Sequence, residues 1–343
     1  MRTRLVDNWN YLFENFKSKQ IDIYYTEEYV KLYQNEKNKS VCFVYNEGRN
    51  YFLFPYLLRS FYFNHKCYYD FETVYGYGGG IANTYDEGFI TDALKAFYEF
   101  GQSNNYIAGF VRFHPLLNNT SGFSSIGELL TDRLTIAIDL QKGIDTAWMN
   151  EIHTKNRNII KKGCNNGLQF IADYEYAYLD DFIHLYNGTM DKLNADSFYY
   201  FDAEYYENLK DNLHNSFLGV VLSDNKVISS AIFFYSQDYG HYHLSGSDKS
   251  CLNLFPNNFM LWEAAKELQS RNVKLFHLGG GANSDEHNSL LEFKRKFSKS
   301  TYSFQIGKII FNSDVYAKLC VEWERDNPEK SCLFKNYLLK YKY

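Results

Sequence analysis

The sequence predicts a mixed α/β fold in which two domains of similar design follow one another. The length of 343 residues suits two hydrophobic cores of roughly 150 residues each. A series of strands followed by a helix and a further strand occurs in each half of the chain. The distance from Tyr75 to Tyr106 equals that from Tyr242 to Val273, at 31 residues. This repeated spacing indicates two copies of one α/β unit.

The composition is that of a globular protein. Hydrophobic residues make up 45% of the chain, charged residues make up 22%, and the formal net charge is −5. These values exclude a disordered chain and a protein that coats DNA through a broad basic surface. The aromatic share of 19% is compatible with stacking on sugar rings, but a bias in codon usage explains it more readily.

The chain shows no signal for export or for spanning a membrane. The apolar run Tyr51–Phe63 is interrupted by Pro55 and Arg59 and is shorter than the roughly 20 residues that cross a bilayer. No apolar stretch follows the first residues, so we expect a cytoplasmic protein without a secretory signal, with peripheral membrane contact left open. The six cysteines form no CxxC pair, which favours reduced thiols and no metal site.

In the first half, alternating apolar residues predict a hairpin over residues 41–58 with its turn at Asn46–Gly48. An apolar stripe predicts a helix over residues 86–101, with a capping box formed by Thr84 and Glu87. Residues 106–113 then form a strand.

The second half repeats this order. Residues 217–222 and 227–235 predict a hairpin, residues 239–246 a third strand, Pro256 opens a helix, and residues 273–278 form the next strand. We place the boundary near residue 145, giving domains over residues 1–145 and 146–343.

The segment Phe276–Ser298 is the most informative one, because it combines a strand, a glycine turn and a helix. The turn Gly279–Gly281 can bring a ligand close to the backbone, although an ordinary flexible turn has the same composition. Lys294 falls on the apolar stripe of the following helix. It either extends its ammonium to water or meets a phosphate or a developing oxyanion in a cleft.

Other polar residues have a structural and a functional interpretation. Arg157 and Lys161 lie one helical turn apart and could grip a phosphate or face water. Arg112 and His114 share a face at the end of a strand, where ligands gather in α/β folds. The helix start at Asn257 and Asn258 could hold a pyrophosphate on its free amides. Three histidines remain, His241, His243 and His277. No carboxylate or cysteine is spaced to complete a metal site with them, so we interpret them as structural.

The motifs of hydrolases, kinases and dehydrogenases are missing: there is no GxSxG, P-loop or GxGxxG. Instead, the chain resembles the FemABX-type aminoacyltransferases and related acyltransferases built from two GNAT-like halves. The resemblance covers most of the chain, and its most specific part is the glycine turn followed by Phe293 and Lys294. It is also carried by Tyr75–Gly80, Arg112–Leu117, Arg157–Gly163 and Thr189–Lys192.

The resemblance implies two GNAT-like domains in tandem around a shared cleft, with Phe293 and Lys294 in the cleft and the lysine steadying donor or intermediate charge. It also implies a contact with a sugar-nucleotide acceptor near Thr189, where the family usually has an arginine and this chain has Lys192. As donor-binding residues we expect Tyr242, His243, Leu244, Ser245, Asn257 and Asn258. As acceptor-binding residues we expect Arg112, His114, Arg157, Lys161, Lys192, Gly279, Gly280 and Gly281.

The expected reaction is direct attack of an acceptor amine on a thioester or ester carbonyl, without an acyl-enzyme. The general base stays open between Glu72, Asp196, His243 and solvent. Three functions follow: an N-acyltransferase with acyl-CoA as co-substrate, acting on an amino sugar or cell-surface precursor; an aminoacyl-tRNA-dependent transferase of peptidoglycan synthesis; and a non-catalytic glycan-binding module. No tightly bound cofactor is expected.

Overall fold

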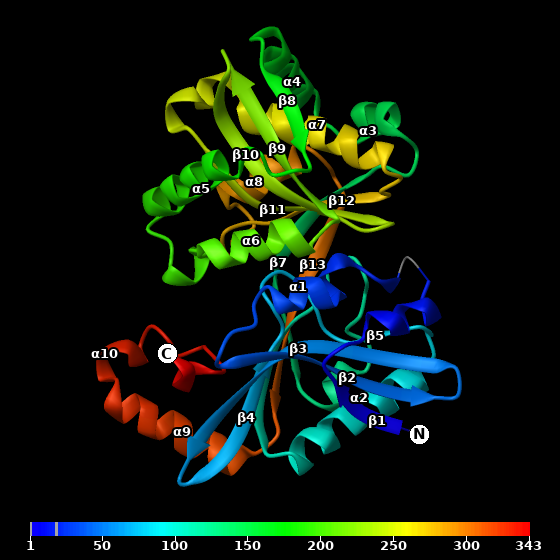
Figure 1. Ribbon diagram of the computed structural model, residues 1–343, viewed down its shortest axis with the longest axis vertical. Helices are drawn as coiled ribbons and strands as arrows, with labels where there is room; N and C mark the ends of the chain where they lie inside the picture. Colours follow the sequence, from blue (N-terminus) through cyan, green and yellow to red (C-terminus); the bar gives the residue numbers. More distant parts are fainter. Residues whose placement is uncertain (1, 18–19) are drawn as a thin grey trace. The chain divides into compact units, whose positions relative to one another are not determined.

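The computed structural model describes residues 2–17 and 20–343, which form two compact units (Figure 1). The first unit extends to Asp132 and also includes Phe304–Tyr343, and the second is Arg133–Ser303. This partition differs from a division at residue 145, because the C-terminal 40 residues pack on the first unit. No short window of sequence indicates that these residues pair with a strand about 200 positions earlier in the chain.

The first unit is a mixed sheet in the order β1-β2-β3-β4-β6-β13, with the short β5 paired to β3. Helix α2 packs against β2, β3 and β6, and its buried side chains Phe89, Leu94 and Phe97 join the aromatic core of the sheet. The strands are β1 (Arg2–Val6), β2 (Asn38–Glu47), β3 (Asn50–Phe63), β4 (Lys66–Glu72), β5 (Ile81–Ala82), β6 (Tyr106–Arg112) and β13 (Thr301–Ile310); the helices are α1 (Glu27–Lys31), α2 (Glu87–Ser103), α9 (Ser313–Asp326) and α10 (Pro328–Ser331).

The hairpin, helix and strand predicted in the first half are confirmed as β2–β3, α2 and β6. The helix cap differs from the predicted capping box. The side chain of Asp86 accepts the amides of Gly88 and Phe89 at 2.9 and 3.1 Å, while Thr84 accepts the amide of Asp86. A carboxylate next to the first free amides satisfies them directly, so the predicted Thr84–Glu87 pair is wrong.

The C-terminal segment completes the first unit. Strand β13 pairs antiparallel with β6, from Ile306–Arg112 to Ile310–Ala108. The following helix α9 buries Leu319 in a small cluster with Ile107, Ala108 and Tyr68 of the sheet. The sheet of the first unit is therefore finished by residues that the chain reaches only after building the second unit.

The second unit is a sheet in the order β7-β12-β11-β10-β9-β8. Helix α7 packs on β8, β9 and β10 and contacts α3 and α4, whereas α5 packs on β10 and β11 from the other side (Figure 1). The strands are β7 (Glu128–Asp139), β8 (Gln169–Asp173), β9 (Ser216–Ser223), β10 (Lys226–Tyr235), β11 (Tyr239–Ser247) and β12 (Leu275–Gly280); the helices are α3 (Ile144–Asn150), α4 (Thr154–Asn165), α5 (Leu179–Leu193), α6 (Ala203–Asn212), α7 (Pro256–Ser270) and α8 (Ser289–Arg295).

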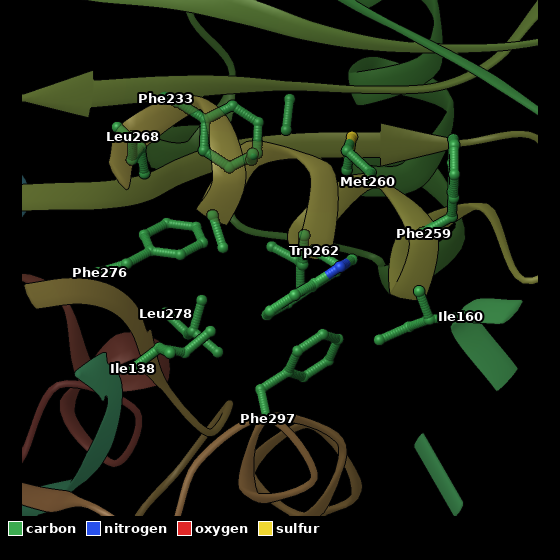
Figure 2. Packing of buried hydrophobic residues seen from close by; sticks show 14 of the residues in the cluster. Ile138, Ile160, Phe233, Phe259, Met260, Trp262, Leu268, Phe276, Leu278 and Phe297 are labelled. Carbon is green, nitrogen blue, oxygen red and sulfur yellow. The ribbon is translucent and has the colours of Figure 1, made fainter. Parts of the chain in front are cut away.

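The core of this unit forms beneath α7. Figure 2 shows Trp262 of this helix with Leu278 of β12 and Phe297 around its indole, all members of one buried cluster. Nine of the fifteen residues of α7 are buried, so the helix is held by burial on several sides rather than by a narrow stripe. The packing of α7 places its first turn beside Ser229 of β10 and Ser247 of β11.

The repeat predicted from spacing is confirmed as a topological one. In the first unit the meander β2–β3–β4 leads through α2 to β6, which is parallel to β4. In the second unit the meander β9–β10–β11 leads through α7 to β12, which is parallel to β11. Each unit thus contains one parallel strand–helix–strand crossover after three antiparallel strands. None of the helices in residues 2–17 and 20–343 combines the length and apolar character needed to cross a bilayer.

Substitution of Gly246 tests the packing of α5 on β11. A Cβ at this position would lie 2.3 Å from the backbone of Leu185 and Tyr186, so we expect Gly246→Ala to lower the free energy of unfolding by about 2 kcal/mol or more. The matched control is Gly188→Ala in α5, where a Cβ meets nothing within 4 Å and should stabilise the helix by about 0.5–1 kcal/mol. Urea denaturation of both variants measures this, and equal effects would contradict the close helix–strand contact.

Candidate active site

The parallel strands of the second unit separate at their carboxyl ends. The ladder joins β11 to β12 at Tyr239–Leu275, Gly240–Phe276 and His241–His277. It records no further pair among the described residues, although β11 runs on to Ser247 and β12 to Gly280. Ligands of open α/β sheets gather at such carboxyl ends.

A bulge lies in β11 at this point. Ile232 of β10 pairs with Leu244, and its neighbour Phe233 pairs with Tyr242, so His243 is the extra residue. Bulges redirect the backbone and interrupt the ladder, and they are frequent next to active sites. The predicted donor segment Tyr242–Ser245 therefore lies where β11 has parted from β12 and leaves regular pairing with β10.

Helix α7 begins close to this segment. Its N-cap Phe255 has a φ of +62° and gives no side-chain cap, and its first turn carries no acidic residue. Among the described residues no acceptor is recorded for the amides of Asn257 and Asn258. The Asn257 side-chain oxygen accepts the hydroxyls of Ser229 and Ser247, both at 2.7 Å, which ties the helix start to β10 and β11.

The side chain of Asn258 lies away from this start. It is buried and donates to Asn156 of α4 at 2.7 Å, and Asn156 donates in turn to the Lys296 carbonyl at 3.3 Å. Asn258 thus has a packing role between two helices, and only its backbone amide is available at the helix end.

The glycine turn follows β12 and is shaped by close contacts. Gly279 has a φ of +76°, beside a shift of register between β12 and β7. A Cβ on Gly280 would lie 2.7 Å from the Leu134 carbonyl, and one on Gly281 would lie 3.0 Å from the side chain of Asn288, which caps α8. Each of the three glycines therefore has a structural reason at its position.

Lys294 of α8 reaches the glycine turn at the end of β12. Its side chain is buried, with 7% of the residue exposed, and its Nζ donates to the Gly280 carbonyl at 2.7 Å. Burial, and after it the charge of Arg133, lowers the pKa of Lys294 from 10.5 to about 7. Of the two interpretations of this lysine, extension of the ammonium to water is wrong for this structure.

Phe293 is partly buried against the same core as α7 and packs edge-on to Phe297, with ring centroids 5.5 Å apart. This packing holds α8 against the core of the unit, and it thereby helps to place Lys294 beside Gly280. The structure therefore brings together Lys294 and the glycine turn, at the same end of the sheet as the parted strands.

His243 is a poor candidate for the general base. Burial lowers its pKa to about 3, with the neighbouring His241 adding to the effect. Its ring lies 4.3 Å from that of Phe234, and its Nε2 is 3.3 Å from the Tyr205 hydroxyl. His241 packs instead on His277, at 5.6 Å between centroids.

Of the residues of the second unit that were predicted to bind anions, some are bonded to other parts of the protein and others are exposed to solvent. Arg157 donates to the carbonyls of Trp148, Met149 and Ile152 at 3.0–3.1 Å, so its guanidinium caps the end of α3. Lys161 and Lys192 are exposed. Asp196, a candidate base, is exposed and caps a short 3₁₀ helix through the Phe198 amide.

The candidates in the first unit are also engaged. Arg112 donates to the Thr73 carbonyl at 2.7 Å and lies 3.4 Å from Glu72, which also pairs with Lys342. His114 and Asp22 form a fully buried pair at 2.6 Å. The His114 Nδ1 accepts the Leu116 amide, so the proton sits on Nε2 and is donated to Asp22. Glu72 is neutralised by two cations and is unsuited to be a base.

Sequence reasoning missed Arg133. This residue of β7 donates to the Gly281 carbonyl at 3.0 Å. It lies about 160 residues before Lys294 in a strand with no motif, and only the pairing of β7 with β12 reveals it.

Comparison with known proteins agrees with this geometry. Residues 168–295 match the acetyltransferase (GNAT) domain family, a range that contains the bulge, the glycine turn and Lys294. A search of the curated proteins gives no match. The crystal structure of FemX is similar over 93% of this chain and 99% of its own, with 12% identity and a TM-score of 0.73.

Two further solved structures share the architecture. A tandem GNAT protein from the clavulanic acid biosynthesis pathway matches 91% of this chain and 99% of its own, at 6% identity and a TM-score of 0.51. The C-terminal domain of a putative lysylphosphatidylglycerol synthetase from Agrobacterium fabrum matches 82% and 86%, at 14% identity and a TM-score of 0.52.

Most of the second unit, residues 168–295, therefore matches the GNAT acetyltransferase domain family. The whole chain has the two-domain, GNAT-like fold of the FemABX type, and the prediction of tandem GNAT-like units is confirmed.

The buried lysine makes stability depend on pH in a defined direction. Because the pKa of Lys294 is about 7 when folded and about 10.5 when unfolded, the unfolded chain binds more protons between these values. The loss of unfolding free energy caused by burying a charged Lys294 is therefore largest below pH 7, and it disappears above pH 10.5. We expect Lys294→Met to be more stable than the parent at pH 7, with an advantage that shrinks by roughly 4 kcal/mol towards pH 10.

Urea denaturation of both proteins at several pH values measures this difference. Lys299→Met, at an exposed position of the same segment, should show no such dependence. A constant difference between Lys294→Met and its parent across this range would contradict the lowered pKa.

Proposed function

We propose that this protein is an N-acyltransferase that moves an acyl group from a thioester or ester donor to an amine. The observation that carries the proposal is Lys294, a buried amine hydrogen-bonded to Gly280 at the end of β12. The match of residues 168–295 to a GNAT acetyltransferase domain supports the same reaction class.

The reaction is a direct transfer. The acceptor nitrogen attacks the donor carbonyl, a C–N bond forms, and the C–S or C–O bond of the donor breaks. Backbone amides of the segment Tyr242–Ser245 and the N–H groups of Lys294 are suited to polarise the donor carbonyl, because preorganised donors in a buried site act strongly on developing charge. No acyl-enzyme intermediate is needed.

Acyl-CoA is the proposed donor. The first turn of α7 has two amides with no recorded acceptor and no acidic side chain, which suits a pyrophosphate at a helix N-terminus. The segment Tyr242–Ser245, which contains the β11 bulge, could contact the acyl group of the same donor through its backbone.

An aminoacyl-tRNA ester is the second candidate, and the segment between β11 and α7 favours it. Residues 248–255 contain no glycine, and the amides of Ser250, Cys251 and Phe255 are bonded within the segment's own turns. A diphosphate would therefore find only the two amides of α7 rather than a continuous nest.

The proposed acceptor is an amine of an amino sugar or of a cell-wall or cell-surface precursor. This class follows from the resemblance to FemABX-type aminoacyltransferases. The side chains predicted to bind it have structural partners or are exposed, so the acceptor class depends on that resemblance alone.

Replacing Lys294 tests the catalytic role. We expect Lys294→Ala to lower kcat by at least about 100-fold while substrate binding persists, because the lysine acts on charge that develops during transfer. Lys299→Ala, an exposed lysine five residues away, should retain the parent rate. An unchanged kcat in Lys294→Ala would refute the role of Lys294.

Calorimetry with coenzyme A and acetyl-CoA, and in parallel with a UDP-linked muramyl peptide, tests the substrate classes. Saturable binding of coenzyme A supports the acyl-CoA donor. Binding of the muramyl nucleotide alone moves the donor to aminoacyl-tRNA, and absence of both contradicts the enzymatic proposal in favour of a glycan-binding module.

A further inference from the structure

Two cationic side chains are anchored on neighbouring carbonyls of one glycine turn. Lys294 reaches the turn from α8 and donates to Gly280 at 2.7 Å. Arg133 reaches it from β7 and donates to Gly281 at 3.0 Å. The two hydrogen bonds hold the same turn from two elements that are far apart in the sequence.

The missing side chain of Gly280 makes this arrangement possible. A Cβ there would lie 3.1 Å from Cδ and 3.2 Å from Cγ of Arg133, as well as 2.7 Å from the Leu134 carbonyl. The aliphatic part of Arg133 therefore runs across Gly280, and its guanidinium continues to the next carbonyl. Any larger residue would push Arg133 away from the turn.

The charges around Lys294 come from few groups. Arg133 is the charged side chain recorded as acting on it. On its own helix, Glu292 and Arg295 pair with each other at 2.6 Å. Strand β12 contributes His277, whose ring packs on His241, and the glycine turn contributes only backbone carbonyls. No acidic partner for the Lys294 amine is recorded in the described part of the chain.

We propose that the Lys294 amine is the proton acceptor of the transfer reaction, and that Arg133, which holds the next carbonyl of the same glycine turn, is its positioning residue. The inference rests on the proposed acyl transfer and assigns its general base, which the sequence left open.

The proton balance closes within the site. When the acceptor amine attacks, its nitrogen becomes positively charged, and one of its protons passes to the Lys294 nitrogen as the C–N bond forms. The resulting Lys294 ammonium then gives that proton to the departing thiolate or alkoxide as the C–S or C–O bond breaks. Lys294 returns to its neutral form, and no further reactant is required.

Arginine at position 294 separates proton acceptance from simple charge stabilisation. Arginine carries the same charge but stays protonated at any accessible pH. If Lys294 accepts a proton, Lys294→Arg and Lys294→Gln both lose at least about 100-fold in kcat. Retention of more than about a tenth of the parent kcat by Lys294→Arg would overturn the proton-acceptor role.

Substitution of Arg133 tests the positioning role and provides a readout that needs no substrate. The 13Cε signal of Lys294, identified by its loss in Lys294→Gln, reports the protonation of the amine by NMR in the full chain. We expect a midpoint near pH 7 in the parent, since the pKa of Lys294 is lowered to about 7. In Arg133→Gln the midpoint should rise by about one pH unit, because a like charge has been removed.

Arg133→Lys keeps the positive charge. Its NMR midpoint should therefore stay close to that of the parent. The rising limb of kcat/KM with pH should move with the NMR midpoint in each variant. An unchanged midpoint in Arg133→Gln, or equal shifts in both Arg133 variants, would overturn the role of Arg133.

The two levels of the proposal fail differently. A shifted NMR midpoint with no transfer from any thioester or ester donor would refute the proposed function and leave the Arg133–Lys294 relation standing. Active transfer with an active Lys294→Arg variant would keep the proposed function and refute Lys294 as the proton acceptor.

Discussion

The hydrogen bond between the Lys294 amine and the Gly280 carbonyl is the contact on which the candidate site depends. It joins α8 to the end of β12 and places an ionisable group in a buried position. A buried ammonium is unfavourable unless its charge is compensated, and the charged side chain recorded as acting on Lys294 is another cation, Arg133. Burial and the neighbouring cation thus both lower the pKa of Lys294, and its amine is held by a backbone carbonyl.

The geometry around this contact comes from a crossover that occurs once in each unit. In the second unit, α7 connects two parallel strands that stay paired over three residue pairs and then separate. In the first unit, β4 and β6 remain paired as far as Glu72–Phe110, and a further parallel bridge joins Gly78 to Phe113. The start of α2 is also occupied by the Asp86 carboxylate, whereas the start of α7 is not capped. The same topology therefore ends differently in the two units: the parallel strands part after three pairs in the second unit, and a further bridge joins the chain beyond them in the first.

Much of the polar inventory serves the fold. Arg157 caps α3, Asn258 bridges two helices, and His114 is closed into a pair with Asp22. Each was a reasonable ligand candidate by residue type and spacing, because arginine, asparagine and histidine bind anions and hydrogen-bond carbonyls with the same groups. Spacing along a helix shows which residues share a face, but the partner that occupies the face comes from another part of the chain.

The sequence by itself determined the class of fold, the order of the strands and helices in both repeats, and the position of Lys294 on the apolar stripe of its helix. These features depend on local periodicity and turn chemistry, which are contained in short windows of sequence. Only the tertiary structure decided that the chain after Phe304 completes the first unit, that the β11 bulge falls at His243, and that Arg133 stands beside Lys294. Each of these depends on strand pairing or contact across many residues, and such pairing is selected by the packing of the whole unit rather than by any segment alone.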